Sequence, residues 1–280
     1  MPLTDEATQR SSGTVPDEPT AAMGFCVSHA PQIFLEPAEE DPAELARVHH
    51  GYRLFAQRAA ELKLDALCVV ALDHLHNHFL DLVPMFTVFT GDPVVAAFNG
   101  TRVTSAAAPD LANDMLDHLL ESGFDPAFSQ REVLDHSFMI PLHYAQSAGL
   151  SVPVIPLIVN AYVPPQPSIR RCYDLGRAMA RWSQRAGVRL GVVATGGMSH
   201  YPGTDRFHHP SVEADQEVMG WLTAGEGERL VSLSAVGLDQ RGMVELRTWA
   251  VAVGARGASA KATVHSYWDS GHCGYAVVEL

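Results

Sequence analysis

Short, continuous apolar runs alternate with longer amphipathic segments along most of this chain, and this alternation limits its fold more than any other feature. An uninterrupted apolar run bounded by turns is typical of a strand that is buried on both faces of a sheet. Segments with apolar residues at steps of three and four are typical of helices that cover such a sheet. We therefore expect an α/β fold of three layers, α/β/α, with a central sheet that is largely parallel or mixed.

The predicted strands and helices follow one another in turn. A short apolar run ends near His29, and the longer runs predict buried strands at 65–73, 152–160 and 188–197. Amphipathic patterns predict helices at 43–64, 109–124 and 168–187. Pro109 suits the first turn of a helix, and Gly123 and Gly187 suit helix ends.

The first segment differs from the rest in composition. Residues 1–22 are largely polar and lack the apolar stretch of a signal peptide, so we expect a disordered tail there. With 47% hydrophobic residues in a chain of 280, residues 23–280 can form one large core. We expect a single domain in that range.

Charge and cysteine content restrict the partners. The net charge of -13 disfavours nucleic acid, because proteins that bind it gather Lys and Arg into a patch. No apolar run is long enough to cross a bilayer, which disfavours a membrane partner. The four cysteines form no C-x-x-C pair, so a cytoplasmic location fits best. Small molecules are the expected partners.

Three histidines directly follow apolar runs. His29 follows GFCVS, His74 follows LCVVALD and His200 follows VVATGGMS. Sheets of this kind bind ligands where strands end and loops begin, so a polar group at that position has added weight. The sequence therefore predicts a site with several imidazoles at one sheet edge, although each histidine alone could be an ordinary loop residue.

The segment DHLHNHF holds further histidines at steps of two. In an extended segment, His74, His76 and His78 would share one face, and neutral imidazole is a common metal ligand. This spacing raises the alternative of a zinc-dependent hydrolase. A polar strand end that presents histidines to water is equally compatible with the spacing.

Two acidic residues are open to more than one interpretation. Asp135 and His136 in LDHSFMIPL form either a carboxylate–histidine pair or an ordinary helix cap. Glu245 in GMVELRTWAVAVG lies on a predicted helix and is expected, from its neighbours alone, at the surface. No serine lies in a G-x-S-x-G turn, and no cysteine is placed as a nucleophile, so acyl transfer is disfavoured.

Several segments, taken in order, resemble the class III extradiol ring-cleaving dioxygenases, a family that includes the catalytic subunit of protocatechuate 4,5-dioxygenase. They are SHAP, LDHLHNHF, LDHSFMIPL, VIPLIVNAYVPPQPSIRRCYDLGRA, ATGGMSH and VELRTWAV. The resemblance implies that 23–280 is a non-haem iron(II) enzyme. It would insert both atoms of dioxygen into a catechol-like ring of the catechol, gallate, aminophenol or hydroxypyridone type.

The resemblance also implies roles for individual residues. The Fe(II) ligands would be His29, His74 and Glu245, and this set leaves half of an octahedral site open for substrate and dioxygen. His200 and His136 would act as acid and base. Ser137 stands where the family has glycine in an Asp-His-Gly motif. Residues expected to face the substrate are His76, His78, Ser137, Asn160 and Tyr162.

Two alternatives to the dioxygenase remain at this stage. One is the zinc hydrolase built on His74, His76 and His78, and the other is a non-catalytic binding module of the same fold. A homo-oligomer is the default assembly, because closed symmetric assemblies are common. A separate small subunit, which the family's protocatechuate enzymes have, is a further expectation to test.

Overall fold

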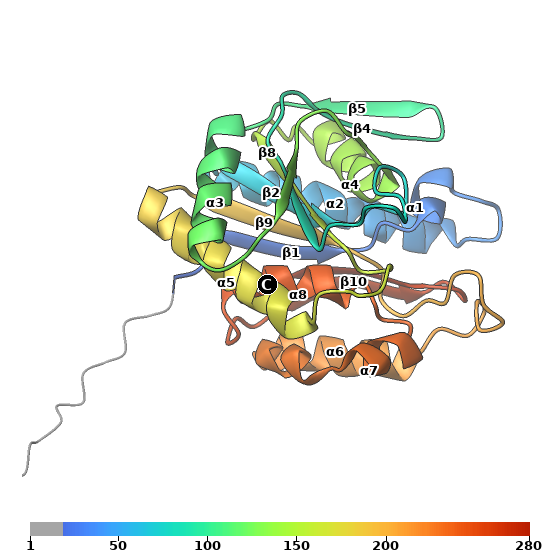
Figure 1. Ribbon diagram of the computed structural model, residues 1–280. Coiled ribbons are helices and arrows are strands. Elements are labelled where there is room, and N and C mark those ends of the chain that lie inside the picture. Colours follow the sequence, from blue (N-terminus) through green and yellow to red (C-terminus); the bar gives the residue numbers. More distant parts are fainter. Residues whose placement is uncertain (1–18) are drawn as a thin grey trace, which may run out of the picture.

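The computed structural model describes residues 19–280, in which helices cover both faces of a central sheet (Figure 1). The main sheet has eight strands in the spatial order β10 (Thr263–Asp269), β11 (Gly274–Glu279), β1 (Met23–Val27), β9 (Leu190–Thr195), β2 (Ala66–Ala71), β8 (Val154–Val159), β3 (Phe86–Phe89) and β6 (Ala127–Ser129). A smaller sheet holds β5 (Thr101–Ser105), β4 (Val94–Phe98) and β7 (Val133–Leu134). The predicted three-layer α/β/α architecture is confirmed.

The four strands at the centre of the main sheet, β1, β9, β2 and β8, run parallel to one another. Every residue of these four strands is buried, as the continuous apolar runs predicted. The sheet is nevertheless mixed, because β11 pairs with β1 and β3 pairs with β8 in antiparallel fashion. The carboxyl ends of the four parallel strands therefore lie side by side at one edge.

The helices form the outer layers. One face carries α2 (Pro42–Glu61) and α4 (His136–Ser147), with α1 (Pro31–Leu35) beside them. The other face carries α5 (Ile169–Ala186), α8 (Leu246–Arg256) and α3 (Pro109–Glu121), and next to these lie α6 (Val212–Ala224), the 3-10 helix η1 (Gly227–Ser232) and α7 (Ala235–Gln240). Strand side chains alternate between two cores: Phe25 and Val27 belong to the core under α2, and Cys26 belongs to the core under α5.

The helix ends follow the local signals in the sequence. Pro109 is the first residue of α3, where its missing N–H has no helical partner to lose. The Ser168 side chain accepts a hydrogen bond from the backbone N–H of Arg171 and so caps α5. Gly187 ends α5 with a positive φ of 66°, which glycine adopts without strain. These predicted ends are confirmed.

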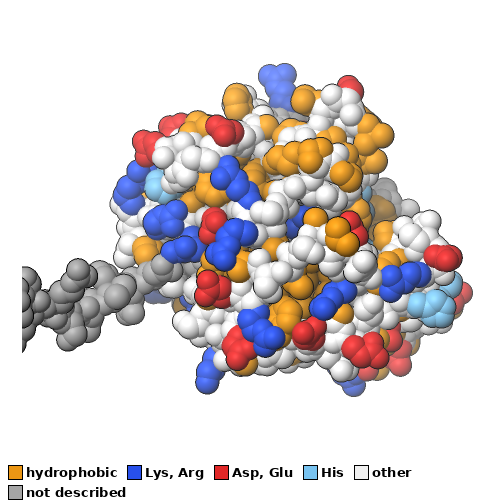
Figure 2. All heavy atoms as spheres, turned by 60° about the horizontal axis from the view of Figure 1, so that its bottom comes forward, with side chains coloured by type: hydrophobic (Ala, Val, Ile, Leu, Met, Phe, Trp, Pro, Cys, Tyr) orange, Lys and Arg blue, Asp and Glu red, His pale blue; other side chains and the backbone are white. Residues whose placement is uncertain are grey.

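Most of the tail predicted at residues 1–22 cannot be compared with the structure, because residues 1–18 lie outside the described residues. Ala21 and Ala22 are bound to the fold: their backbone N–H groups donate to the carbonyls of Ala255 and Leu190 at 2.7 and 2.8 Å. Within residues 19–280, no helix is both long and apolar enough to cross a membrane. On the face shown in Figure 2, Lys and Arg side chains are interspersed with Asp and Glu.

Helices α5 and α8 approach each other through glycines. A Cβ atom at Gly176 of α5 would collide with the carbonyl oxygen of Val251, and one at Gly254 of α8 would collide with the carbonyl oxygen of Tyr173. Backbone atoms cannot move aside as flexible side chains do. The two helices can therefore lie this close only because neither position has a side chain. Their contact also helps to place Glu245, which lies at the N-terminal end of α8.

We predict that Gly176→Ala lowers the free energy of unfolding by about 1–3 kcal/mol, because the added methyl group pushes the two helices apart. Urea denaturation followed by circular dichroism would measure the change. Gly220→Ala is the matched control, because Gly220 also lies in a helix, α6, but a Cβ there meets no atom within 4 Å. It should stabilise the protein by about 0.5–1 kcal/mol. Equal effects of the two substitutions would contradict the packing argument.

Candidate metal centre

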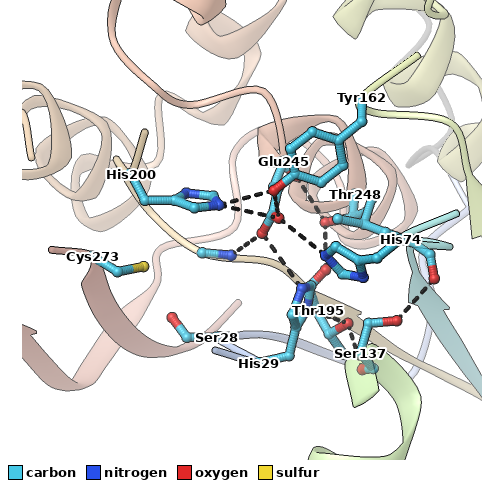
Figure 3. Close-up of polar contacts among 12 residues, drawn as sticks. Ser28, His29, His74, Ser137, Tyr162, Thr195, His200, Glu245, Thr248 and Cys273 are labelled. Carbon is cyan, nitrogen blue, oxygen red and sulfur yellow. Dashed lines mark hydrogen bonds and ion pairs between the residues drawn. The ribbon is translucent and has the colours of Figure 1, made fainter. Parts of the chain in front are cut away.

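Each of the four parallel strands is followed by a side chain of the candidate site. His29 follows β1, His74 follows β2, Tyr162 follows β8 and His200 follows β9. Glu245 comes from the other direction, at the N-cap of α8. Figure 3 shows all four of the other side chains directed toward the carboxylate of Glu245. Residues 216 positions apart in the sequence, from 29 to 245, thus form one cluster.

His29 is buried and is held through its Nδ1 atom. Nδ1 lies 3.1 Å from Oγ1 of Thr195, and this hydroxyl donates to the carbonyl of Ser137 at 3.0 Å. Because the hydroxyl hydrogen is already used, the oxygen accepts from Nδ1–H, and Nε2 is left with its lone pair. Burial lowers the pKa of His29 to about 3, so the ring is neutral. Nε2 lies 3.6 Å from Oε2 of Glu245.

His74 is held in the same way by a carboxylate. Its Nδ1 lies 2.8 Å from Oδ2 of Asp135, which can only accept, so Nε2 faces Oε1 of Glu245 at 3.8 Å. Burial opposes a charge on His74, but the hydrogen bond with Asp135 and the nearby charge of Glu245 outweigh it and raise its pKa to about 10. A metal ion bound here would displace that proton.

Asp135 both caps a helix and pairs with a histidine, the two roles between which the sequence did not decide. It caps α4, since it accepts from the backbone N–H of Ser137 at 2.9 Å. It also pairs with a histidine, although the partner is His74 and not the adjacent His136. Burial opposes its charge, but the hydrogen bond with His74 holds the pKa of Asp135 below its usual range.

Glu245 is 1% exposed, so its predicted position at the surface is wrong. Its carboxylate accepts short hydrogen bonds from the backbone N–H of Gly197 and from the hydroxyl of Tyr162. Burial would raise its pKa, but the nearby His29 and His200 outweigh burial and hold the pKa well below the usual range. No Lys or Arg of residues 19–280 pairs with this carboxylate, so imidazoles alone balance its charge.

The donor atoms suit a divalent transition metal. Two imidazoles have Nδ1 engaged elsewhere, so each can offer the Nε2 lone pair, that of His74 once its proton is displaced, and one buried carboxylate completes the set. Metal–ligand bonds of about 2.1 Å can bridge donors up to about 4.2 Å apart, and the distances of 3.6 and 3.8 Å fall inside that limit. A second set is also close, because ligand atoms of His29, His74 and His136 lie within 4.8 Å of one another.

His200 lies beside this donor set and has one ring nitrogen fixed. Nδ1 lies 3.0 Å from the carbonyl oxygen of Met198, which can only accept, so Nδ1 carries a hydrogen. Nε2 lies 2.9 Å from the hydroxyl of Tyr162 and 3.4 Å from Oε1 of Glu245. Burial opposes protonation of His200, but the charge of Glu245 outweighs it and raises the pKa. Nε2 is therefore the atom that can exchange a proton with a ligand.

A buried carboxylate fixes the loop that carries His200. Asp215 accepts from the backbone N–H and the hydroxyl of Ser199 at 2.8 and 3.0 Å, and from the hydroxyl of Tyr267 at 3.0 Å. It is fully buried, and this burial raises its pKa to about 6. The backbone N–H of His200 donates to the carbonyl of Gly242 at 2.9 Å. The backbone that carries the imidazole of His200 is thus fixed by Asp215 on one side and by Gly242 on the other.

The site opens into a cavity of about 450 Å³. The wall combines polar groups with apolar residues such as Pro31, Pro202 and Phe207, a lining that suits an aromatic ring. Burial lowers the pKa of His136, which also lines the cavity, to about 4. The remaining polar wall includes His29, His74, Tyr162, His200, Glu245 and His272.

Several residues expected to face the substrate do not line the metal cavity. The segment after β2 is bent: His76 is exposed and lies with His74 at an adjoining cavity, and His78 pairs with Glu132 at 3.1 Å. The hydroxyl of Ser137 contacts Asp135 at 2.6 Å and is buried away from the cavity. The Asn160 side chain bonds to the backbone of Val163 and holds a turn. Tyr162 is the member of the expected set that lines the metal cavity.

Other contributors to the site were not predicted from the sequence. Thr195 is a polar residue at the end of the apolar strand β9, and that position could have marked it. Asp215 and His272 show no comparable signal. The hairpin of β4 and β5, which lies near His136, was also missed, although Asn99-Gly100 is a strong signal for a two-residue hairpin turn.

The family described as the catalytic LigB subunit of aromatic ring-opening dioxygenase matches residues 23–278. The chain is 33% identical over 178 residues to a 2,3-dihydroxyphenylpropionate/2,3-dihydroxicinnamic acid 1,2-dioxygenase of Paraburkholderia xenovorans, an alignment that covers 63% of this chain and 55% of that protein. It is 31% identical to the enzyme of the same name from Cupriavidus necator, over 71% of this chain and 62% of that protein. The chain thus spans less than two thirds of the length of these relatives.

A solved structure is similar in fold. The crystal structure of the uncharacterized protein JW3007 from Escherichia coli K12 superimposes with a TM-score of 0.66 and covers 92% of this chain and 99% of that one. The two sequences are 15% identical, so the similarity concerns the fold alone.

We predict that Thr195→Val weakens metal binding by about 10- to 100-fold, because His29 loses the acceptor that fixes its Nδ1–H. Competition with a chromophoric chelator would measure the affinity. Thr87→Val is the matched control: Thr87 is also a buried strand residue, and its hydroxyl has no hydrogen-bond partner within the described chain. An unchanged affinity in Thr195→Val would show that Thr195 does not orient the ligand.

Proposed function

Because this chain belongs to the family of the catalytic LigB subunit of aromatic ring-opening dioxygenases, we propose that it cleaves a catechol-type ring beside its two hydroxyl groups. Both atoms of dioxygen would enter the product. The relatives with 2,3-dihydroxyphenylpropionate in their names support this extradiol chemistry.

The observation that carries the proposal is the arrangement of two imidazoles and one buried carboxylate at the floor of an open cavity. His29 and His74 present Nε2, and Glu245 presents both oxygens. Two histidines and one carboxylate with vacant positions are typical of non-haem Fe(II) oxygenases. We assign Fe(II) to these three residues. When bound, Fe(II) supplies a centre at which a catechol and dioxygen meet and through which electrons pass between them.

The assigned role of His200 is to move a proton. Its Nδ1–H is fixed by Met198, so Nε2 points into the cavity with its protonation free to change. The hydroxyl of Tyr162 lies 2.9 Å from this Nε2, so a substrate hydroxyl has to approach Nε2 beside Tyr162 or displace it. A catechol hydroxyl within hydrogen-bond distance of Nε2 would transfer its proton to Nε2, and His200 would return it later as an acid.

His136 is assigned the second acid–base role. Its ring centroid lies 4.2 Å from that of His74 and 5.3 Å from that of Phe98. Burial keeps this imidazole neutral at pH 7, because its pKa is lowered to about 4. A neutral imidazole in an apolar wall can donate one hydrogen bond to a bound oxygen atom and orient it.

The substrate that we propose is a catechol with a short acidic side chain. The relatives named above act, by their names, on 2,3-dihydroxyphenylpropionate and 2,3-dihydroxicinnamic acid. Both are catechols with a three-carbon acid beside one hydroxyl. The apolar part of the cavity lining, with Phe207 and the prolines, suits the ring of such a compound.

Assembly and location stay predictions. We propose a homo-oligomer, with a separate small subunit as the alternative, and light scattering of the purified protein would distinguish the two. A cytoplasmic location is supported by the cysteines, since Cys26, Cys68, Cys172 and Cys273 are all free and buried.

We predict oxygen uptake when the Fe(II)-loaded protein receives 2,3-dihydroxyphenylpropionate, with a yellow ring-opened product. His200→Phe should retain the metal and lower kcat by about 100- to 10,000-fold, because the acid–base group is lost. His50→Phe, the same change at an exposed residue of α2, is the control and should leave kcat unchanged. Near-native turnover by His200→Phe would refute the role of His200.

The panel of substrates also tests the alternatives. If none of the catechols, gallates, aminophenols and hydroxypyridones causes oxygen uptake, the result would support the non-catalytic binding module. Hydrolysis with zinc and without oxygen would support the hydrolase, which is disfavoured because His76 and His78 do not join His74.

We predict further that Glu245→Gln loses the metal, whereas His136→Gln keeps it. The two variants separate the two close donor sets, since only Glu245 belongs to the assigned set and only His136 belongs to the set of three histidines. Metal content after gel filtration, measured by mass spectrometry of the elements, is the readout. Loss from His136→Gln with retention by Glu245→Gln would move the third ligand to His136.

A further inference from the structure

A second cavity, of about 600 Å³, adjoins the metal site. One of its walls is the end of the hairpin formed by β4 and β5, at the top of Figure 1, and contributes residues 97–102. The opposite wall holds His74, His76, Asp135 and His136. His74 and His136 line both cavities, so the two cavities adjoin at these two imidazoles.

The second cavity has an unpaired positive charge. Arg102 lies in its wall, is exposed, and has a guanidinium group without a hydrogen bond or ion pair to any residue in the range 19–280. The carboxylate of Asp135 does not compensate it, because Asp135 is 5% exposed and already accepts hydrogen bonds from His74 and Ser137. An anion that enters this cavity thus meets a free guanidinium group.

The metal cavity has no such group. Its lining, which lies entirely within the described residues, contains neither Lys nor Arg, and its acidic members are Asp73 and Glu245. Asp73 accepts backbone hydrogen bonds from His76, Asn77 and His78. A carboxylate held in the metal cavity would therefore lie near two other carboxylates and meet no ammonium or guanidinium group of the lining.

We propose that the second cavity binds the acidic side chain of the substrate and that Arg102 pairs with its carboxylate. This inference rests on the proposed function, in which the catechol ring occupies the metal cavity. The ring would stand beside His136, with its side chain directed along His136 and His74 toward the hairpin. Arg102 then selects catechols that carry an anionic substituent over neutral ones, since guanidinium and carboxylate form paired, charge-assisted hydrogen bonds.

The hairpin holds Arg102 at a fixed place relative to the metal site. The turn at Asn99 and Gly100 has positive φ at both residues, 47° and 78°, as a tight two-residue hairpin turn requires. Arg102 is paired across the hairpin with Ala97, whose small side chain leaves room beside the guanidinium stem. Strand β4 also pairs with β7, which ends directly before Asp135. The same backbone thus positions the arginine and the carboxylate that orients His74.

The test compares two substrates that differ in charge. They are 2,3-dihydroxyphenylpropionate and 3-propylcatechol, whose side chains have the same number of carbon atoms. For Arg102→Gln, we expect kcat/KM for the propionate to fall on the order of 10- to 100-fold, mainly through KM, as for loss of a hydrogen bond to a charged group. Turnover of 3-propylcatechol should change by less than about two-fold, because that substrate makes no such bond. Anaerobic calorimetry with the propionate should show the same loss in affinity.

Two further variants complete the design. Arg102→Lys should recover part of the preference for the propionate, because the charge is kept while the paired geometry is lost. Arg170→Gln is the matched control: Arg170 is exposed on α5 and lines neither cavity. It should behave as the wild type with both substrates.

The outcomes separate the inference from the proposed function. If Arg102→Gln turns over both substrates as the wild type does, the acidic side chain binds elsewhere, and the inference fails while the dioxygenase function stands. If Arg102→Gln lowers turnover of both substrates equally, Arg102 supports the structure of the site and does not recognise the charge of the substrate. If the wild type takes up no oxygen with either compound, the proposed function itself fails.

Discussion

The charge of one buried carboxylate determines how the rest of the site is built. Glu245 is almost completely shielded from water, and no ammonium or guanidinium group of residues 19–280 reaches it. An uncompensated charge in such a place costs several kcal/mol, about the size of a domain's whole stability. The protein surrounds it with imidazoles from the ends of three parallel strands, a backbone N–H and a phenol. A divalent cation held by His29, His74 and Glu245, as proposed, would complete this balance.

Much of this arrangement could be predicted from the sequence, because its main signals are local. The buried strands are visible as apolar runs, and a histidine after such a run is placed at the sheet edge by the strand itself. Glu245 could not be found in this way. Its neighbours Arg247 and Thr248 are polar and suggest an exposed helix face, yet both are fully buried. Arg247 donates hydrogen bonds to the backbone carbonyls of Pro167 and Val244, although its Nη2 has no partner among the described residues. The contact with Pro167 joins segments far apart in the chain, so it could not be foreseen from the neighbours of Glu245.

The misplacement of His76 and His78 has a related cause. Steps of two place side chains on one face only if the backbone is extended, and Asp73 prevents this by binding the backbone N–H groups of the next residues. Asp73, and not the spacing of the histidines, therefore determines the direction of the His76 and His78 side chains. The role of Thr195 could be inferred only with the register of β9 against β1 known, since that register places its hydroxyl beside His29.

The long separation in sequence between His29 and Glu245 has a consequence for the life of the protein in the cell. A chain that is still being synthesised has no Glu245 to offer, and an unfolded chain does not hold the three donors together. Binding of the proposed metal would therefore favour the finished fold alone and stabilise it by mass action. The supply of metal would set how long a molecule persists as well as how fast it works, and a chain deprived of metal would become the preferred target of proteolysis.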